Sequence, residues 1–100
     1  MPEAHAIIFV VDASDRERLD EAKKEWGAIL EMDLVKHVPV LLCANKQDLE
    51  GAMSADEISR EFKVDQVSRR ILVQPVVALK GVGVSEGFEW LLSAMQDFEL

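Results

Sequence analysis

The sequence predicts an α/β fold in which three parallel strands alternate with three helices. Apolar runs rich in β-branched residues recur along the 100 residues, at positions 5–11, 38–44 and 71–77. A stretch with apolar residues at helical spacing follows each run. The runs are continuous, and continuity is typical of strands buried on both faces of a parallel sheet. Repeated strand-then-helix units form such sheets with right-handed crossovers.

The first unit is the run that begins at His5, followed by a helix predicted over residues 16–32. Residues 12–15 join the two and carry aspartate and serine side chains, which favour a helix start. The apolar residues of the helical segment fall on one face, and this face is expected to pack on the sheet. They are Leu19, Ala22, Trp26, Ile29 and Leu30.

The second unit pairs the run at 38–44 with a helix that opens at Ser54. Ser54 and Glu57 have the spacing of a capping box, in which each side chain bonds the other residue's backbone N–H. Ile58 and Phe62 follow one turn apart and are expected to face the core.

The third unit starts with residues 71–77 and ends in a helix. Pro75 has no N–H to donate, so this strand is expected at a sheet edge or at a bulge. A turn containing Gly81 and Gly83 leads into the helix. The predicted apolar stripe of this helix comprises Phe88, Leu91, Leu92 and Met95, with Trp90 beside it.

Composition excludes several classes of function. A net charge of −8 argues against non-specific binding to nucleic acid or to anionic membranes, which needs basic patches. No apolar run approaches the roughly 18 residues of a membrane span, so we expect no direct membrane anchor in this chain. Cys43 is the single cysteine and lies within a predicted strand. We therefore expect a buried thiol, no disulfide and a reducing, cytoplasmic compartment.

The tetrapeptide Asn45-Lys46-Gln47-Asp48 follows the second apolar run and has the chemistry of a guanine reader. Guanine presents N1–H and the N2 amine side by side, and the carboxylate of Asp48 can accept from both. Adenine lacks this donor pair, so in a dry pocket the wrong base leaves a buried charge unpaired. Asn45 would hold the pocket's backbone and approach N7 and O6, while the stem of Lys46 can lie against the base. The alternative is an ordinary strand followed by a polar turn.

Three candidate segments follow the carboxyl ends of the three predicted strands, where ligands of parallel sheets bind. They are Asp12, the tetrapeptide, and the segment from Ala78 to Lys80. A backbone N–H near Ala78 could donate to guanine O6. The three loops therefore predict one ligand site.

Three segments in order and at compatible spacing resemble the Arf/Arl family of small GTPases. They are residues 10–18 (VVDASDRER), 44–49 (ANKQDL) and 86–91 (EGFEWL), and the resemblance covers essentially the whole chain. It implies a P-loop-type small GTPase domain, of which residues 1–100 form the C-terminal half. It also implies binding of GTP or GDP, protein partners, and peripheral membrane association of the parent protein.

The resemblance assigns roles to five residues. Asp48 reads the base edge, Asn45 and Lys46 shape the pocket, and Ala78 supplies the contact to O6. The family usually has Cys-Ala-Thr or Ser-Ala-Lys at this last site. This chain departs from that pattern at Leu79, which offers apolar packing in place of a polar side chain.

The chain lacks the motifs that bind phosphate and magnesium in this family. A phosphate-binding loop needs Gly-Lys followed by Ser or Thr, but the sequence has no Gly-Lys dipeptide and no threonine. Residues 48–51 spell D-x-x-G, but they overlap the base motif, and Ala52 follows in place of the catalytic glutamine. We therefore expect a truncated domain with no magnesium site, no GTP hydrolysis by this chain alone, and weak or absent nucleotide binding.

Two alternatives to the GTPase half remain open. One is a non-catalytic protein-interaction module that keeps the Arf-like fold. The other is a small domain of another class, such as a receiver, with Asp12 as phosphoacceptor and Lys80 as its later lysine. In a GTPase half and in an Arf-like interaction module alike, the strand order of the family leaves residues 5–11 as an uncovered edge. We expect self-association, or pairing with an N-terminal partner, through this edge.

Overall fold

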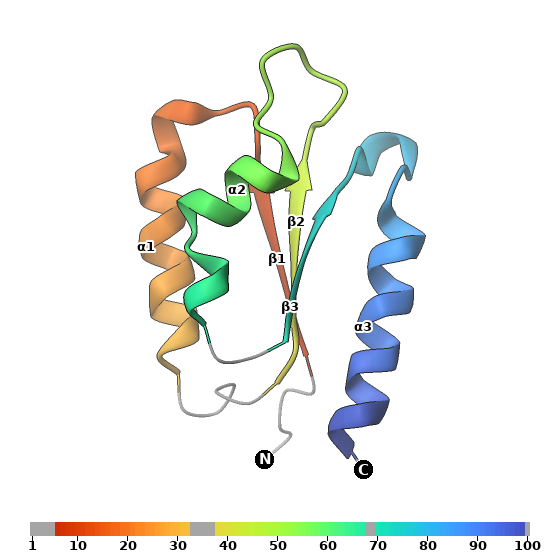
Figure 1. Ribbon diagram of the computed structural model, residues 1–100. Helices are drawn as coiled ribbons and strands as arrows, with labels where there is room; N and C mark the ends of the chain where they lie inside the picture. Colours follow the sequence, from red (N-terminus) through yellow and green to blue (C-terminus); the bar gives the residue numbers. More distant parts are fainter. Residues whose placement is uncertain (1–5, 33–37, 68–69, 100) are drawn as a thin grey trace.

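The computed structural model describes residues 6–32, 38–67 and 70–99 (Figure 1). Three parallel strands form one sheet in the order β1-β2-β3. They are β1 Ile7–Asp12, β2 Val40–Asn45 and β3 Ile71–Pro75. The predicted parallel α/β fold is confirmed; His5, which opens the first apolar run, lies outside the described residues.

Two helices cover one face of the sheet and a third covers the other (Figure 1). The first face carries α1 Leu19–Leu30 and α2 Ala55–Glu61, and the second carries α3 Val84–Glu99. Short 3-10 turns flank these elements: η1 Arg16–Arg18, η3 Val64–Gln66 and η4 Ala78–Lys80. No helix in the described part of the chain has the length and apolarity needed to cross a bilayer.

The helix predicted over residues 16–32 is shorter than expected. It opens with the tighter turn η1, which the Asp15 carboxylate caps by accepting a hydrogen bond from the Arg18 N–H at 3.3 Å. The regular α-helix begins at Leu19, directly after η1, and ends at Leu30.

The second helix begins where it was predicted. The Ser54 hydroxyl accepts from the Glu57 N–H at 3.2 Å, and the Glu57 carboxylate accepts from the Ser54 N–H at 3.4 Å. The strand before it is displaced, because β2 starts at Val40 and includes Asn45. The first residue of the tetrapeptide is therefore the last residue of a strand.

The face under α1 and α2 holds the hydrophobic core. Trp26 packs edge-to-face on Phe9, with 5.5 Å between ring centroids, and on Phe62, with 5.8 Å. Such aromatic pairs add about 0.5–1.5 kcal/mol each beyond their buried area. The other buried members are Val11, Ala13, Val40, Leu42, Ala44, Met53 and Ile58. The predicted packing roles of α1 and α2 are confirmed.

β1 is buried on one face only, so the prediction of two-sided burial is wrong for this strand. Phe9 and Val11 face the core, whereas Ile8 and Val10 are 46% and 58% exposed. The reason is that α3 packs chiefly on β2 and β3. β1 is also an edge strand, as expected.

The apolar stripe predicted for α3 is partly wrong. Leu91 is buried as expected, but Phe88 and Leu92 are 46% and 59% exposed, and Ala94 is buried instead. Gly87 is buried so close to the sheet that a Cβ would lie 3.0 Å from a side-chain methyl of β2. The helix therefore approaches the sheet along a narrow line that starts at this glycine.

β3 is the second edge strand, as the position of Pro75 predicted. Pro75 ends the strand, and Val76 and Val77 are buried in the turn beyond it. Gly81 and Gly83 have left-handed φ angles of 72° and 79°. A Cβ on Gly83 would collide with the Pro75 carbonyl oxygen. The two glycines fold the chain back from β3 into α3.

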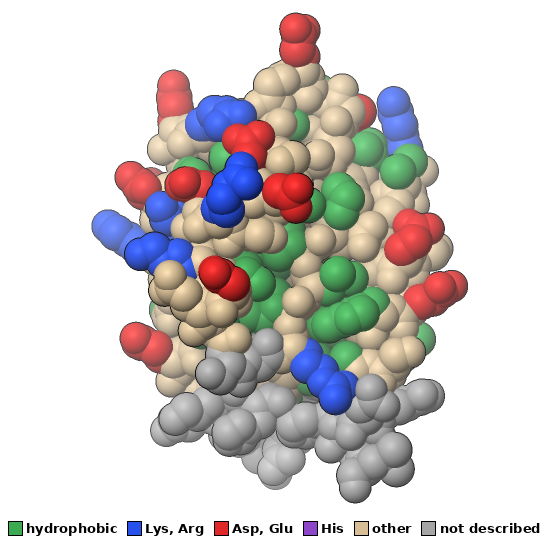
Figure 2. All heavy atoms as spheres, viewed as in Figure 1, with side chains coloured by type: hydrophobic (Ala, Val, Ile, Leu, Met, Phe, Trp, Pro, Cys, Tyr) green, Lys and Arg blue, Asp and Glu red, His purple; other side chains and the backbone are tan. Residues whose placement is uncertain are grey.

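Charged side chains of both signs interleave over α1 and α2. Lys23 pairs with Glu61 at 3.3 Å, and Arg16 pairs with Glu57 at 3.6 Å. On the face shown in Figure 2, acidic and basic side chains intermingle over the upper left part, and hydrophobic side chains show in patches beside them toward the middle. Exposed pairs of this kind stabilise little individually.

Candidate functional site

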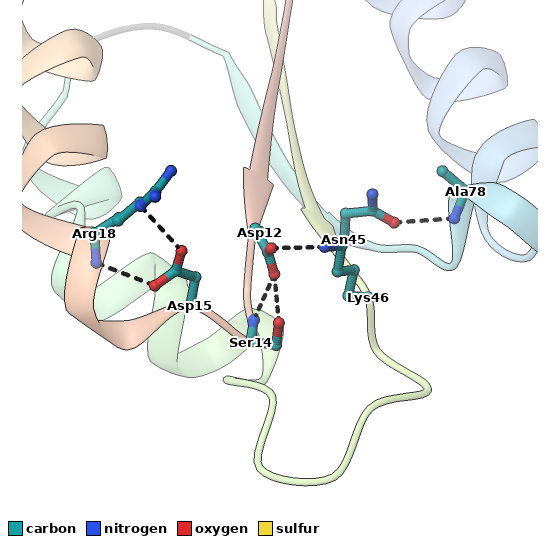
Figure 3. Close-up of polar contacts among 7 residues, drawn as sticks. All are labelled: Asp12, Ser14, Asp15, Arg18, Asn45, Lys46 and Ala78. Carbon is teal, nitrogen blue, oxygen red and sulfur yellow. Dashed lines mark hydrogen bonds and ion pairs between the residues drawn. The ribbon is translucent and has the colours of Figure 1, made fainter.

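The carboxyl ends of the three strands meet at one edge of the sheet, at the top of Figure 1. Asp12, the last residue of β1, is paired with Asn45, the last residue of β2. The loops after β2 and β3 leave from the same edge. The three segments that were predicted to follow the strands are thus brought together, and Figure 3 shows contacts among them.

Asn45 joins the loop after β2 to the turn after β3. Its Oδ1 accepts a hydrogen bond from the backbone N–H of Ala78 at 2.9 Å (Figure 3). The bond links residues 33 positions apart and places η4 against the start of the tetrapeptide. The N–H predicted to meet a base carbonyl is therefore engaged by Asn45 in this structure.

Lys46 reaches back across the end of the sheet to Asp12. Its Nζ lies 2.8 Å from Asp12 Oδ2 (Figure 3). Oδ1 of the same carboxylate accepts from the N–H and the hydroxyl of Ser14, at 3.0 and 2.6 Å. The hydrogen bond from Lys46, followed by those from Ser14, lowers the pKa of Asp12 to about 2. The contact with Asp12 likewise raises the pKa of Lys46.

The backbone of Lys46 has a left-handed φ of 66°. Such conformations cost free energy for residues other than glycine, and they are concentrated at binding and catalytic sites. Here the turn directs the lysine side chain back over β1 while the loop continues outward.

Asp48 lies on the solvent side of the same loop. Its carboxylate is 3.7 Å from the Nζ of Lys80, the last residue of η4, and the two side chains are 38% and 66% exposed. The carboxylate is accessible to solvent, rather than enclosed as a dry pocket requires. A ligand bound to this carboxylate would have to shield it from water in part with its own surface.

Gln47 had no predicted role, yet it fixes the loop in place. Its Nε2 donates to the Met53 carbonyl at 2.8 Å, and its backbone N–H donates to the Val76 carbonyl at 3.2 Å. The Met53 N–H donates in turn to the Ala13 carbonyl at 2.8 Å. In the sequence, Gln47 is recognisable only as a long amide side chain between two motif residues. That feature does not indicate its hydrogen-bond partners.

Leu79 and Gly81 form the rim of the site. Leu79 is 100% exposed, and Gly81 ends η4 in a left-handed conformation. An exposed leucine beside polar groups offers apolar surface to a flat ligand. Within the described segments, no group of three or more His, Cys, Asp or Glu side chains could hold a metal ion.

The same arrangement of strands, helices and loops occurs in known proteins. The model of the ADP-ribosylation factor (Arf) family matches residues 1–95. The chain belongs to this family. It spans about half the length of the curated relatives it matches. Its β1-to-α3 arrangement is the C-terminal half of an Arf-family small GTPase domain.

Individual relatives agree with the family assignment. ADP-ribosylation factor K of Dictyostelium discoideum is 40% identical over 94 residues, which are 93% of this chain and 50% of that protein. ADP-ribosylation factor-like protein 14 of Mus musculus is 40% identical over 98 residues, covering 95% and 51%. The solved structure of the Arl6 (BBS3) small GTPase of Trypanosoma brucei, with bound nucleotide analogue GppNp, superposes with a TM-score of 0.88 at 34% identity. That superposition covers 93% of this chain and 59% of the Arl6 chain. The predicted Arf/Arl resemblance is confirmed.

Proposed function

We propose that this chain carries the guanine-recognition half of an Arf-type GTP/GDP switch. The main support is the Asn45–Ala78 hydrogen bond, which joins the tetrapeptide loop and η4 beyond the carboxyl ends of the strands. Ligands of parallel α/β sheets bind at this edge. The nucleotide analogue in the similar Arl6 structure supports the same ligand class here.

Asp48 is the residue assigned to select guanine. Its ion pair with Lys80 is long, at 3.7 Å, and both side chains are exposed. A pair of this kind contributes about 0–1 kcal/mol, so a base can displace Lys80 at little cost. The carboxylate oxygens can then accept from the N1–H and the N2 amine of guanine. Adenine offers no such pair of donors.

The loop and η4 are assigned the remaining contacts. Asn45 holds Ala78 in place, and the Ala78 N–H would share its hydrogen bond between Asn45 Oδ1 and guanine O6. The stem of Lys46, stretched toward Asp12, would lie along the plane of the base. Leu79 adds apolar surface at the rim.

Binding of the phosphates is not assigned to these residues. Residues 1–100 contain no Gly-Lys dipeptide and no threonine, so they supply neither a phosphate loop nor the switch threonine of a magnesium site. We therefore propose a partial small GTPase domain that reads the base and does not hydrolyse GTP alone. With base contacts alone, GDP should bind no more tightly than the millimolar range.

An NMR titration with GDP tests this proposal. GDP should shift the backbone amides of Lys46, Asp48 and Ala78 without saturating in the micromolar range, whereas ADP should leave them unshifted. Asp48→Asn should abolish the response to GDP. Glu50→Gln removes an exposed carboxylate of the same loop and should respond as the wild type. Equal shifts with ADP, or no shift with GDP, would contradict the proposal.

A protein-interaction role is the second candidate, and the exposed apolar side chains of β1 and α3 favour it. A module of this kind would bind its partner without nucleotide and would be indifferent to Asp48→Asn. Self-association through β1 is one form of this role, and light scattering across micromolar concentrations tests it. A cytoplasmic location stays a prediction, to be tested by imaging the tagged full chain.

A further inference from the structure

The ion pair between Lys46 and Asp12 is tighter than its contribution to stability requires. Its two charged atoms are 2.8 Å apart, whereas the ion pairs described above on α1, α2 and η4 measure 3.3–3.7 Å. Both side chains are nevertheless partly exposed, Lys46 by 48% and Asp12 by 37%. Ion pairs with this exposure add little to the free energy of unfolding. The close geometry therefore calls for an explanation other than stability.

The Asp12 carboxylate is fixed in position and in orientation. Asp12 is the last residue of β1 and is paired with Asn45 of β2, so the sheet holds its backbone. The N–H and the hydroxyl of Ser14 both donate to Oδ1, at 3.0 and 2.6 Å. Oδ2 is thereby turned toward Lys46 (Figure 3). Asp12 is a rigid acceptor that Ser14 orients.

Lys46 is held at its backbone as well as at its ammonium group. Its φ of 66° is left-handed, and the next residue, Gln47, is anchored through its N–H to the Val76 carbonyl at 3.2 Å. The cost of a left-handed turn at a residue other than glycine exceeds what a partly exposed ion pair contributes. Stability therefore explains neither feature. Together they give the lysine side chain one direction.

We propose that Asp12 is a positioning residue of the guanine site, which holds the Lys46 stem as a fixed platform for the base and keeps the Lys46 ammonium away from Asp48. The proposal rests on the proposed function and adds a residue of β1 to it. Asp12 acts through Lys46 and makes no contact with the base itself.

The platform follows from the way the Lys46 side chain is stretched. It runs from the loop after β2 to the end of β1, and it is tied at both ends (Figure 3). A free lysine would lose rotamer freedom when a base settles on it, and this loss weakens binding. Lys46 has lost that freedom before the ligand arrives. Its apolar stem is thus ready to pack against a base whose edge Asp48 reads.

The second effect of Asp12 is on the competition for Asp48. Asp12 is the main cause of the raised pKa of Lys46, but the charges of Asp15 and Asp48 raise this pKa as well. The ammonium is therefore attracted by the carboxylate that has to accept from guanine. Without Asp12 it would turn toward Asp48 and join Lys80 there as a competitor of the base. Both effects of losing Asp12 weaken guanine binding.

An NMR titration of the full chain, with ¹³C-labelled lysine, tests the proposal with GDP as the probe. In the wild type, the ring current of the base should shift the side-chain methylenes of Lys46 together with the amides of Asp48 and Ala78. In Asp12→Asn, the amides should still respond, with a Kd about three- to tenfold higher. The methylene shift, extrapolated to saturation, should shrink. Glu17→Gln removes an exposed carboxylate of η1 and should behave as the wild type.

A double-mutant cycle separates positioning from a general structural effect. Lys46→Met keeps an apolar stem but removes the ammonium that Asp12 holds. In this background Asp12→Asn should change the Kd for GDP by less than about twofold, because the partner through which Asp12 acts is gone. Amide spectra of the free variants confirm that each is folded.

Two results would overturn the positioning role and leave the guanine site standing. One is the same Kd for GDP in the wild type and in Asp12→Asn. The other is an equal loss of affinity on Asp12→Asn with lysine or methionine at position 46. If GDP shifted neither Asp48 nor Ala78 in the wild type, the guanine site itself would be contradicted, and the role of Asp12 with it.

Discussion

The two faces of the sheet differ in how completely they are covered. Under α1 and α2, the rings of Phe9, Trp26 and Phe62 close a continuous core. Under α3, Ile8 and Val10 remain about half exposed. Neighbouring residues of one strand therefore lie in opposite environments. One apolar run can thus contribute to a buried core on one face of the sheet and to a solvent-exposed apolar surface on the other.

The closed face also supports the site. Met53 is 1% exposed in the core, and its carbonyl holds the Gln47 side chain while its N–H bonds the Ala13 carbonyl. The loop that carries Asp48 is thus tied to the rigid side of the molecule. The loop is also tied to the turn after β3, because the Gln47 N–H donates to the Val76 carbonyl at 3.2 Å.

The largest expected difference between the faces comes from two phenylalanines. Phe62→Ala should lower the free energy of unfolding by about 3–5 kcal/mol, because it opens a cavity against Trp26. Phe88→Ala should cost less than about 1 kcal/mol, because its ring is 46% exposed. Urea denaturation followed by circular dichroism measures both. Similar losses of stability at the two positions would mean that the sheet face under α3 is as completely buried as the face under α1 and α2.

A smaller difference is expected at the two glycines before α3. Gly83→Ala should destabilise by about 1–3 kcal/mol, because its φ is 79° and a Cβ would meet the Pro75 carbonyl. Gly81→Ala has the same backbone strain but open space around it, so it should cost less. Thermal unfolding of the two variants compares them. If Gly81→Ala lowered the stability more than Gly83→Ala, position 83 would not lie as close to the Pro75 carbonyl as described.

The smallest expected effect is at Asp12, where the ion pair with Lys46 is partly exposed. Asp12→Asn should cost below about 1 kcal/mol at neutral pH, after allowance for solvent screening. The pKa of Asp12 falls from 3.8 to about 2 on folding, so its stabilising contribution is present above pH 3.8 and is lost as the pH falls toward 2.

Unfolding curves between pH 7 and pH 2 test this dependence. The wild type and Asp12→Asn should converge in stability at the acidic end. A constant gap across the whole range would show that the Asp12 carboxylate is not held by Lys46 in the folded chain.

Local patterns predicted the elements well, because the signals for them lie within a few residues. The Ser54 cap, the Trp26 face of α1 and the glycine turn before α3 are of this kind. The exposure of Val10 and Phe88 could not be predicted in the same way. A continuous apolar run specifies two apolar faces, but it does not specify what covers them.

The convergence of the three loops at one sheet edge could be predicted, whereas the contacts among them could not. Topology alone brings Asn45 and Ala78 to one edge, because parallel strands end together. The bond of Lys46 to Asp12 depends on a left-handed backbone and on the reach of a long side chain. Neither can be read from the spacing of residues along the chain.

One face of β1 is buried in the core and the other is open to solvent. Single cysteines at adjacent positions test it most directly, as Val10→Cys and Val11→Cys in a Cys43→Ala background. Val10 is 58% exposed and Val11 is 4% exposed, so the thiol at position 10 should react with a disulfide reagent about 100-fold faster under native conditions. Equal rates at the two positions would show that the two faces of β1 are equally accessible to solvent.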